Sequence, residues 1–239
     1  MPDCYRTPSE LIVGRVDGDR DLKIEKMANI ILDNYSKTIT KLLIIGCGTG
    51  VEAIILSKIL NTQVIGLDLI DNFETSLPAN VILKTGDCRK LEFADLSFDF
   101  VFSNHSLEHI IDPHLALSEI CRVLKPGGGI WIGTPNRRRL IGSMSSKTAS
   151  LREKIRLNCE DWKAKCLGKF KNELGAHAGF TDNELLSLMN NAEFSNIKNL
   201  TNCYYQMAYY NHKYIVKTIK YLCLKHYLFP ALYFLGEKK

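Results

Sequence analysis

Three glycines at alternate positions follow a short apolar run, and this arrangement could bring a ligand against the main chain. The run covers residues 42–45, and the glycines are Gly46, Gly48 and Gly50. Glycine has no Cβ, so it tolerates positive φ angles and lets another group approach the backbone closely. The spacing G-x-G-x-G differs from the G-x-G-x-x-G of a dinucleotide pyrophosphate turn. It therefore disfavours NAD and favours another adenosine cofactor.

Two carboxylates lie where the next two apolar runs end. Asp68 follows residues 64–67, and Asp87 follows Gly86 after a run at residues 81–84. In a doubly wound sheet, ligands lie outside the carboxyl ends of the strands. Asp68 is placed to accept hydrogen bonds from both ribose hydroxyls, and Asp87 to accept one from an exocyclic adenine amine. Together they would address the ribose and the base of an adenosine ligand.

The elements that must position these residues alternate between strand and helix. The apolar spacing predicts an opening helix over residues 21–39, with Asp19 or Asp21 as its cap. Strands are then expected at 41–45, 63–67, 81–84, 97–103 and 129–133, with helices at 51–60 and 113–124. This alternation predicts a parallel sheet. Later come a helix at 181–191 with a capping box, a strand at 196–204, a helix at about 214–226 and a final strand at 231–235.

The length of 239 residues suits a single domain over residues 1–239 with two insertions. The first, at about 137–180, holds eleven of the 31 Lys and Arg residues but four of the 26 Asp and Glu residues. It is either a solvated face or a site for an acidic acceptor or an anionic membrane surface. The second, at about 205–229, is rich in Tyr and Leu. It is either a roof over the acceptor pocket, which we favour, or an interfacial helix.

The eight cysteines form no C-x-x-C pair, which favours reduced thiols in a cytoplasmic protein. The chain shows no signal-like start and no uninterrupted apolar stretch of membrane-spanning length. We therefore expect a cytoplasmic protein, with peripheral membrane contact left open, and no metal site. The oligomeric state is not readable from the sequence.

Over about residues 40–136, the chain resembles class I S-adenosylmethionine-dependent methyltransferases of the small-molecule group that includes the ubiquinone-biosynthesis enzymes. Residues 45–50 resemble the first motif of this family, Asp68 its ribose-binding acid and residues 86–88 its adenine motif. Residues 98–109 resemble the fourth-strand segment, whose tip contacts the methionine part of the cofactor. Residues 124–129 resemble the turn before the fifth strand. One departure is Ile44, where many family members carry an acidic residue.

This resemblance implies a Rossmann-like α/β fold. Its seven-stranded, mostly parallel sheet would have helices on both faces and a terminal antiparallel hairpin. S-Adenosyl-L-methionine would be the cofactor and a small, acidic or lipid-linked metabolite the methyl acceptor. The implied cofactor-binding residues are Gly46, Cys47, Gly48, Gly50, Asp68, Leu69, Asp87, Cys88, Asn104 and His105.

Methyl transfer from a sulfonium is an in-line displacement, so the protein mainly has to hold the reacting groups in line. A general base is needed when the acceptor is a weakly acidic hydroxyl. The candidates are His177, His109 and His105. The family often places a histidine shortly before a Phe-Thr helix start, which favours His177. For any one of them, an exposed or packing histidine is the simpler explanation.

Two other functions stay open at this point. A NAD-dependent dehydrogenase could use a similar sheet, although the glycine spacing and the adenine motif disfavour it. A cofactor-binding but inactive partner subunit would use the basic insertion as its interface. Nucleic-acid methylation is disfavoured, because the fourth-strand tip at 103–105 does not resemble a base-flipping motif.

Overall fold

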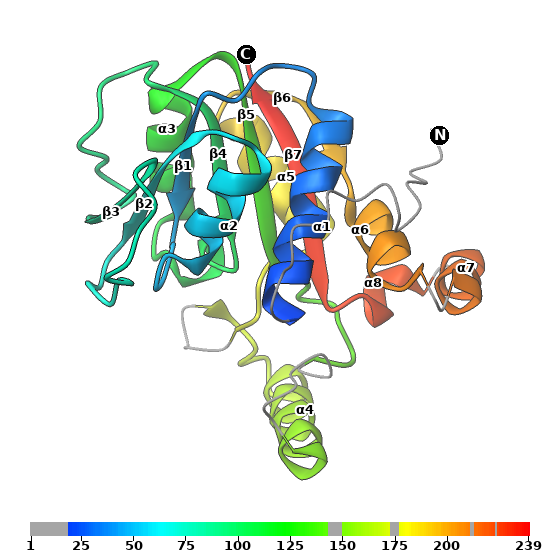
Figure 1. Cartoon of the computed structure of the whole chain (residues 1–239). Coiled ribbons are helices and arrows are strands. Elements are labelled where there is room, and N and C mark those ends of the chain that lie inside the picture. Colours follow the sequence, from blue (N-terminus) through cyan, green and yellow to red (C-terminus); the bar gives the residue numbers. More distant parts are fainter. Residues whose placement is uncertain (1–18, 143–149, 173–176, 211–212, 223) are drawn as a thin grey trace.

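The computed structural model describes residues 19–142, 150–172, 177–210, 213–222 and 224–239. A seven-stranded sheet in the order β3-β2-β1-β4-β5-β7-β6 forms its centre (Figure 1). The strands are β1 (Lys41–Ile45), β2 (Gln63–Asp68), β3 (Val81–Thr85), β4 (Phe98–Asn104), β5 (Leu124–Pro135), β6 (Phe194–Asn199) and β7 (Ala231–Lys238). The pairs among β1–β5 are parallel, whereas β7 runs antiparallel to both β5 and β6. The predicted Rossmann-like sheet with a terminal antiparallel pair is confirmed.

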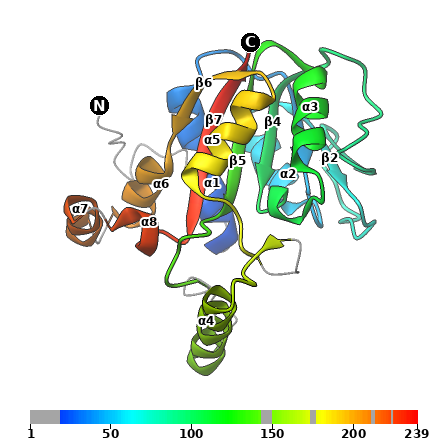
Figure 2. The same cartoon turned by 180° about the vertical axis from the view of Figure 1, so that it is seen from behind.

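Helices cover both faces of the sheet because alternate strand residues point to opposite sides. Leu42 and Ile44 of β1 pack in one core with α1 (Asp19–Asn34), α2 (Val51–Ile59) and α6 (Thr201–Ala208). Leu43 and Ile45 pack in the other core with α3 (Pro113–Val123) and α5 (Asp182–Asn191). The view from behind shows α3 and α5 on this second face (Figure 2). Ile44, where many family members have an acid, is fully buried in the first core.

The helix α5 begins with the predicted capping box. The Thr181 side chain accepts from the backbone N–H of Glu184, and the Glu184 carboxylate accepts from the N–H of Thr181. These bonds satisfy N–H groups that a helix leaves unpaired at its start.

Three predicted boundaries were wrong by five residues. The opening helix ends at Asn34 and not at 39, and the Tyr35 hydroxyl just beyond it donates to carbonyl oxygens of β4 and β5. The sixth strand ends at Asn199, whose side chain accepts from the N–H of Thr201 and turns the chain into α6. The fifth strand starts five residues early, at Leu124, although Gly127 within it has a φ of 68°.

Both predicted insertions contain helices. The basic segment contains α4 (Leu151–Cys166), which projects below the sheet in Figures 1 and 2. The predicted helix at 214–226 is split into α7 (Lys213–Tyr221) and α8 (Lys225–Leu228). Within the described residues, no helix combines the length and the apolar character needed to cross a membrane.

Candidate functional site

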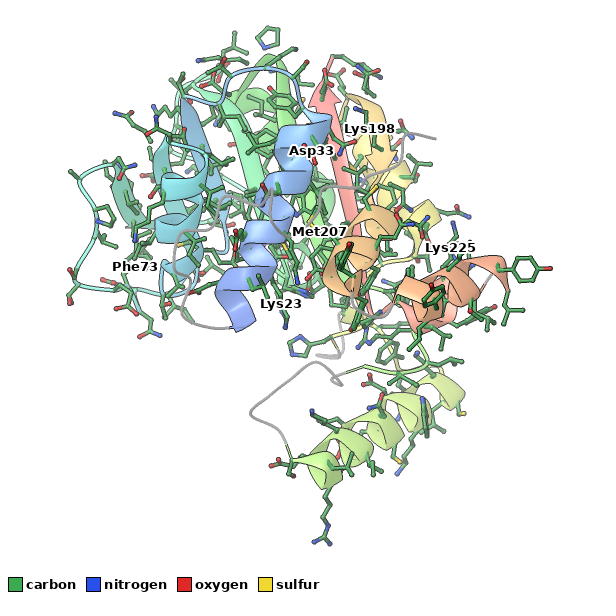
Figure 3. The ribbon with its side chains drawn as sticks, turned by 45° about the vertical axis from the view of Figure 1, so that its right-hand side comes forward. Lys23, Asp33, Phe73, Lys198, Met207 and Lys225 are labelled. Carbon is green, nitrogen blue, oxygen red and sulfur yellow. The ribbon has the colours of Figure 1, made fainter. Side chains whose placement is uncertain are left out.

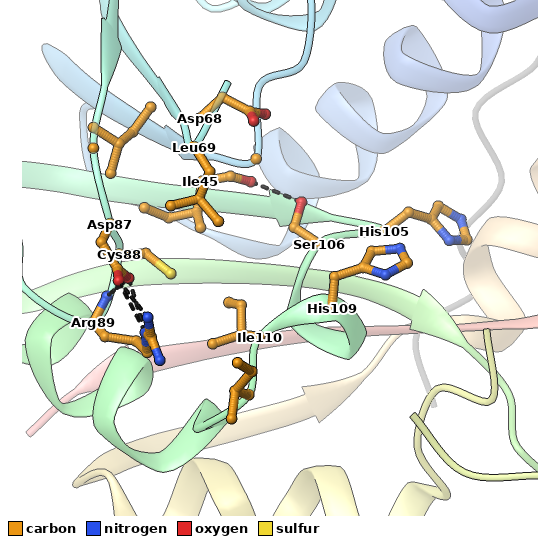
Figure 4. A pocket seen from close by; sticks show the side chains of 14 residues that line it. Ile45, Asp68, Leu69, Asp87, Cys88, Arg89, His105, Ser106, His109 and Ile110 are labelled. Carbon is orange, nitrogen blue, oxygen red and sulfur yellow. Dashed lines mark hydrogen bonds and ion pairs between the residues drawn. The ribbon is translucent and has the colours of Figure 1, made fainter. Parts of the chain in front are cut away.

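A cavity of about 250 Å³ opens at the carboxyl ends of β1, β2 and β4, where the topology places ligands in such sheets. Figure 4 shows side chains from these strand ends pointing into one space. The lining residues are Ile45, Gly46, Leu67, Asp68, Leu69, Gly86, Asp87, Cys88, Arg89, His105, Ser106, His109, Ile110 and Ile111.

The three glycines of the first turn have different reasons to be glycine, although all have positive φ. A Cβ on Gly46 would collide with the Ser106 side chain, and a Cβ on Gly50 with Leu83. A Cβ on Gly48 would meet no protein atom within 4 Å. Packing therefore explains Gly46 and Gly50, whereas Gly48 has open space beside it for an approaching ligand.

The Asp68 carboxylate already braces this turn. One oxygen accepts from the backbone N–H of Gly48 at 2.7 Å, and the other accepts from the N–H of Ile70 at 3.3 Å. An ionised carboxylate has about four lone-pair positions, so each oxygen keeps capacity for one more donor. Asp68 can thus hold the glycine turn and a pair of ligand hydroxyls at the same time.

Arg89 is a pocket residue that the sequence reasoning missed. Its guanidinium donates to both oxygens of Asp87, with the shortest distance of 2.6 Å from Nη2 to Oδ2 (Figure 4). These hydrogen bonds, with a further one from the Arg89 backbone N–H, lower the pKa of Asp87. Asp87 is therefore an ionised acceptor held in place by Arg89. The pair was not foreseen because the i, i+2 spacing does not fix the side-chain conformations that bring the two groups together.

Ser106 is a second residue that was missed. Its hydroxyl donates to the carbonyl oxygen of Ile45 at 2.9 Å and so links the ends of β1 and β4 (Figure 4). Cys88 lines the same cavity, and burial raises the pKa of its thiol to about 11. It therefore stays a neutral thiol near pH 7.

Six of the ten residues predicted for cofactor binding line this cavity, and four do not. Cys47 is buried in the core, and burial raises the pKa of its thiol to about 12. Gly48 and Gly50 lie in the turn beside the cavity. The Asn104 side chain donates to the carboxylate of Glu52 at 3.2 Å. The lining residues from the prediction are Gly46, Asp68, Leu69, Asp87, Cys88 and His105.

The two predicted catalytic histidines lie next to each other, although they are far apart in the sequence. The rings of His109 and His177 meet edge to face, with centroids 4.7 Å apart. Both side chains are exposed, and His109 lines the cavity. The structure therefore brings an imidazole pair to the rim of the cavity.

A buried carboxylate lies behind this rim. Oε1 of Glu108 is 3.5 Å from Nδ1 of His105, and Oε2 accepts from the Thr134 hydroxyl at 3.1 Å. The Glu108 side chain is 1% exposed, and His105 has a φ of 54°, which is unusual for a non-glycine residue. Strained backbone of this kind is concentrated at ligand sites. Glu108 thus places a buried carboxyl group next to the His105 ring, close to the rim.

Part of the basic segment is structural and not available to a ligand. Arg139 is almost fully buried and donates to the carboxylate of Asp161 at 3.2 Å and to the carbonyl oxygen of His177 at 2.8 Å. Lys165 in turn donates to the carbonyl oxygen of Arg139. Arg137 pairs with Glu184 at 2.6 Å. The contacts of Arg139 fasten α4 to the segment that carries His177.

The Tyr/Leu-rich segment contributes to the core and not to the described cavity. Tyr205 stacks on Phe229 with ring centroids 4.2 Å apart, and its hydroxyl accepts from the N–H of Ala231. Tyr204 packs on Tyr233 of β7. None of the described residues between 205 and 229 lines the cavity described above, so the role of this segment as a roof for an acceptor stays a prediction.

Residues 43–132, which contain the glycine turn and both carboxylates, match a family model described as a methyltransferase domain. Demethylmenaquinone methyltransferase from Staphylococcus aureus (strain JH9) is 41% identical over 97 residues, which are 37% of this chain and 40% of that protein. The chain thus matches about two fifths of the length of the curated relatives.

The fold is similar to that of solved structures over a larger part of the chain. A putative sarcosine dimethylglycine methyltransferase from Galdieria sulphuraria has a TM-score of 0.57 at 15% identity, covering 91% of this chain and 85% of that chain. Phosphoethanolamine N-methyltransferase 2 from Haemonchus contortus, solved with S-adenosyl-L-methionine, has a TM-score of 0.55 at 20% identity. The similar region covers 90% of this chain and 52% of the Haemonchus contortus chain. At these identities the likeness shows the fold alone.

Proposed function

We propose that the chain is an S-adenosylmethionine-dependent methyltransferase acting on a small molecule, since its residues 43–132 match a methyltransferase domain and part of the chain is 41% identical to a demethylmenaquinone methyltransferase. The observation that carries this proposal is the shared cavity at the strand ends. The glycine turn, Asp68 and the Asp87–Arg89 pair border one space, in the chain order that the family motifs predict.

The residues present fit such a cofactor. Asp68 would accept from the ribose hydroxyls with the lone pairs that the backbone N–H groups leave over. Asp87 would accept from the adenine amine, and Leu69 and Ile110 would pack on the apolar parts of the adenosine. Gly48 would let the cofactor approach the main chain. Asn104 and His105 lie at the end of β4, on the side where the methionine part belongs.

The chemistry at this site would be mostly positioning. The bound cofactor supplies an activated methyl group on a sulfonium, and holding the acceptor in line with it can contribute about 7 kcal/mol or more to catalysis. For a hydroxyl acceptor, the imidazole of His177 or His109 would remove the proton at the rim of the cavity.

The acceptor is proposed to be anionic or lipid-linked. Exposed basic residues lie on the segments before and after α4, one of which leads to His177. They are Arg138, Lys169 and Lys171. They support an acidic group on the acceptor or a peripheral contact with a membrane. The proposed place of action is the cytoplasm or the membrane surface that faces it.

The test is to incubate the protein and methyl-labelled cofactor with fractionated cell extract, and to identify the labelled product by its mass. We expect one small-molecule product to gain one methyl group. The Asp68→Ala variant serves as the control, because it should lose labelling together with cofactor affinity. Cofactor binding without any labelled product would instead support an inactive partner subunit.

A further inference from the structure

Helix α4 carries two neighbouring stripes of opposite character. Leu151, Ile155 and Trp162 recur at positions i, i+4 and i+11, so they share one face of the helix. Their side chains are 69%, 57% and 45% exposed. The basic residues Arg152, Arg156 and Lys163 are also exposed and follow with the same spacing, one residue later. They therefore form a stripe next to the apolar one.

The side of α4 that holds it to the protein borders the apolar stripe, on the flank away from the basic stripe. Asp161 accepts from Arg139, and the Asn158 side chain bonds with the backbone of Gly142 in both directions. Asn158 therefore lies at the edge of the apolar stripe, whereas the basic stripe faces away from these attachments. Leu151 and Ile155 keep most of their surface exposed despite these contacts. Figure 3 shows α4 below the sheet, with side chains extending from it into the surroundings.

The apolar stripe continues beyond the helix. Leu140 and Ile141 are 49% and 41% exposed, and the indole N–H of Trp162 donates to the carbonyl oxygen of Leu140 at 2.5 Å. The N–H of Leu140 donates to the carbonyl oxygen of Tyr227 in α8, whose side chain is 45% exposed. The exposed apolar surface thus runs from α4 to α8.

Positive charge is concentrated on the same segments. Residues 137–180 and 213–228 hold fifteen of the 31 Lys and Arg residues of the chain, but four of its 26 Asp and Glu residues. The rest of the chain is net acidic. A basic stripe beside an apolar stripe with tryptophan matches the chemistry of an anionic lipid surface, in which apolar side chains enter the headgroup boundary while Lys and Arg contact phosphates.

We propose that α4, with Leu140 and Ile141, docks the protein onto an anionic lipid bilayer. Leu151, Ile155 and Trp162 enter the boundary between headgroups and acyl chains, and Arg152, Arg156 and Lys163 bind lipid phosphates. Arg139 connects α4 to the His177 backbone, so docking sets the rim of the cavity against the membrane surface. That last consequence rests on the proposed function, and it makes the methyl acceptor a membrane-resident molecule.

The first experiment measures flotation of the full chain with vesicles of phosphatidylcholine, with or without about one third phosphatidylglycerol. We expect binding to the anionic vesicles that fades at high salt. Ile155→Glu should weaken it at least about tenfold, and Arg152→Gln with Lys163→Gln about 25-fold. The matched control is Leu32→Glu on α1, where Leu32 is 41% exposed, and it should bind like the wild type. Equal binding of wild type and Ile155→Glu would overturn the proposal.

A second measurement uses the two tryptophans of the chain. Trp131 is fully buried, so a blue shift of emission on adding anionic vesicles would report Trp162. We expect this shift in the wild type and its loss in Trp162→Phe. Vesicle binding without a shift would show that another surface docks.

Other occupants of the α4 surface give different results. An oligomer in solution that Ile155→Glu converts to monomers would make α4 an interface between copies and would overturn the proposal. Tighter binding to a short RNA than to the vesicles, unchanged in Ile155→Glu, would do the same. Calorimetry with S-adenosylmethionine on the same sample separates the two claims: cofactor binding without vesicle binding overturns docking alone, and the reverse result overturns the proposed methyltransferase alone.

Discussion

Two glycines with the same backbone strain allow the ligand role of the first turn to be separated from its structural role. Gly48 has a φ of 54° and Gly168 a φ of 66°, and a Cβ on either would meet nothing within 4 Å. Alanine in the left-handed region costs about 1–2 kcal/mol. In a domain of this size, that loss lowers the Tm by about 3–6 °C. We expect Gly48→Ala and Gly168→Ala to lose stability equally.

The two variants should differ in cofactor affinity. The new methyl group at position 48 would occupy the space beside the cavity, and inserting a methyl into a packed contact costs about 1–3 kcal/mol, or roughly 5- to 150-fold in Kd. Gly168 follows α4, away from the cavity, so Gly168→Ala should bind S-adenosylmethionine like the wild type. Thermal unfolding and isothermal titration calorimetry measure the two effects separately. Unchanged affinity in Gly48→Ala, or an equal loss in Gly168→Ala, would refute the reasoning.

Three further predictions concern single side chains. Asp68→Ala should weaken S-adenosylmethionine binding by at least about 1.5 kcal/mol, which raises the Kd measured by calorimetry roughly 12-fold, because the ribose hydroxyls lose a charged acceptor. Unchanged affinity would count against the cofactor assignment. Arg139→Met should lower the free energy of unfolding in urea by at least about 2 kcal/mol, since buried carbonyl oxygens lose their donor. The control Arg138→Met, at an exposed neighbour, should change it by less than about 0.5 kcal/mol. Equal effects of the two substitutions would contradict the role of Arg139 as the link to α4. Hydrogen bonds from Arg122 lower the pKa of Glu119 below its ordinary 4.5, so its contribution to stability is present above that pH and is lost as the pH falls through the lower folded value. Glu119→Gln should therefore lose less free energy of unfolding between neutral and acidic pH than the wild type. An equal loss in the two proteins, measured by urea unfolding, would contradict this.

The sequence predicted the strands of the parallel sheet well because their apolar runs are short and separated by turn residues. The strand at 41–45 matches β1, and the capping box of Thr181 and Glu184 marks the start of α5. Boundaries failed where a single long-range or turn contact decides them. Asn199 ends β6 through its own side-chain hydrogen bond. The Tyr35 hydroxyl, one residue beyond α1, donates to carbonyl oxygens of distant strands.

The candidate site was predictable as far as its residues follow strand ends. Asp68, Asp87 and the glycine turn come from three strands whose order the alternation implies. Arg89 and Ser106 were missed because their roles depend on contacts with Asp87 and Ile45 that no spacing encodes. The pairing of His109 with His177 requires the fold itself, since 67 intervening residues separate them. The burial of Arg139 within a basic segment likewise follows from tertiary packing.

The most direct test of the methyltransferase assignment is a calorimetric titration of the wild-type chain with S-adenosylmethionine and, separately, with NAD. The site geometry predicts saturable binding of S-adenosylmethionine at one site per chain and no binding of NAD. Binding of NAD without binding of S-adenosylmethionine would contradict the assignment.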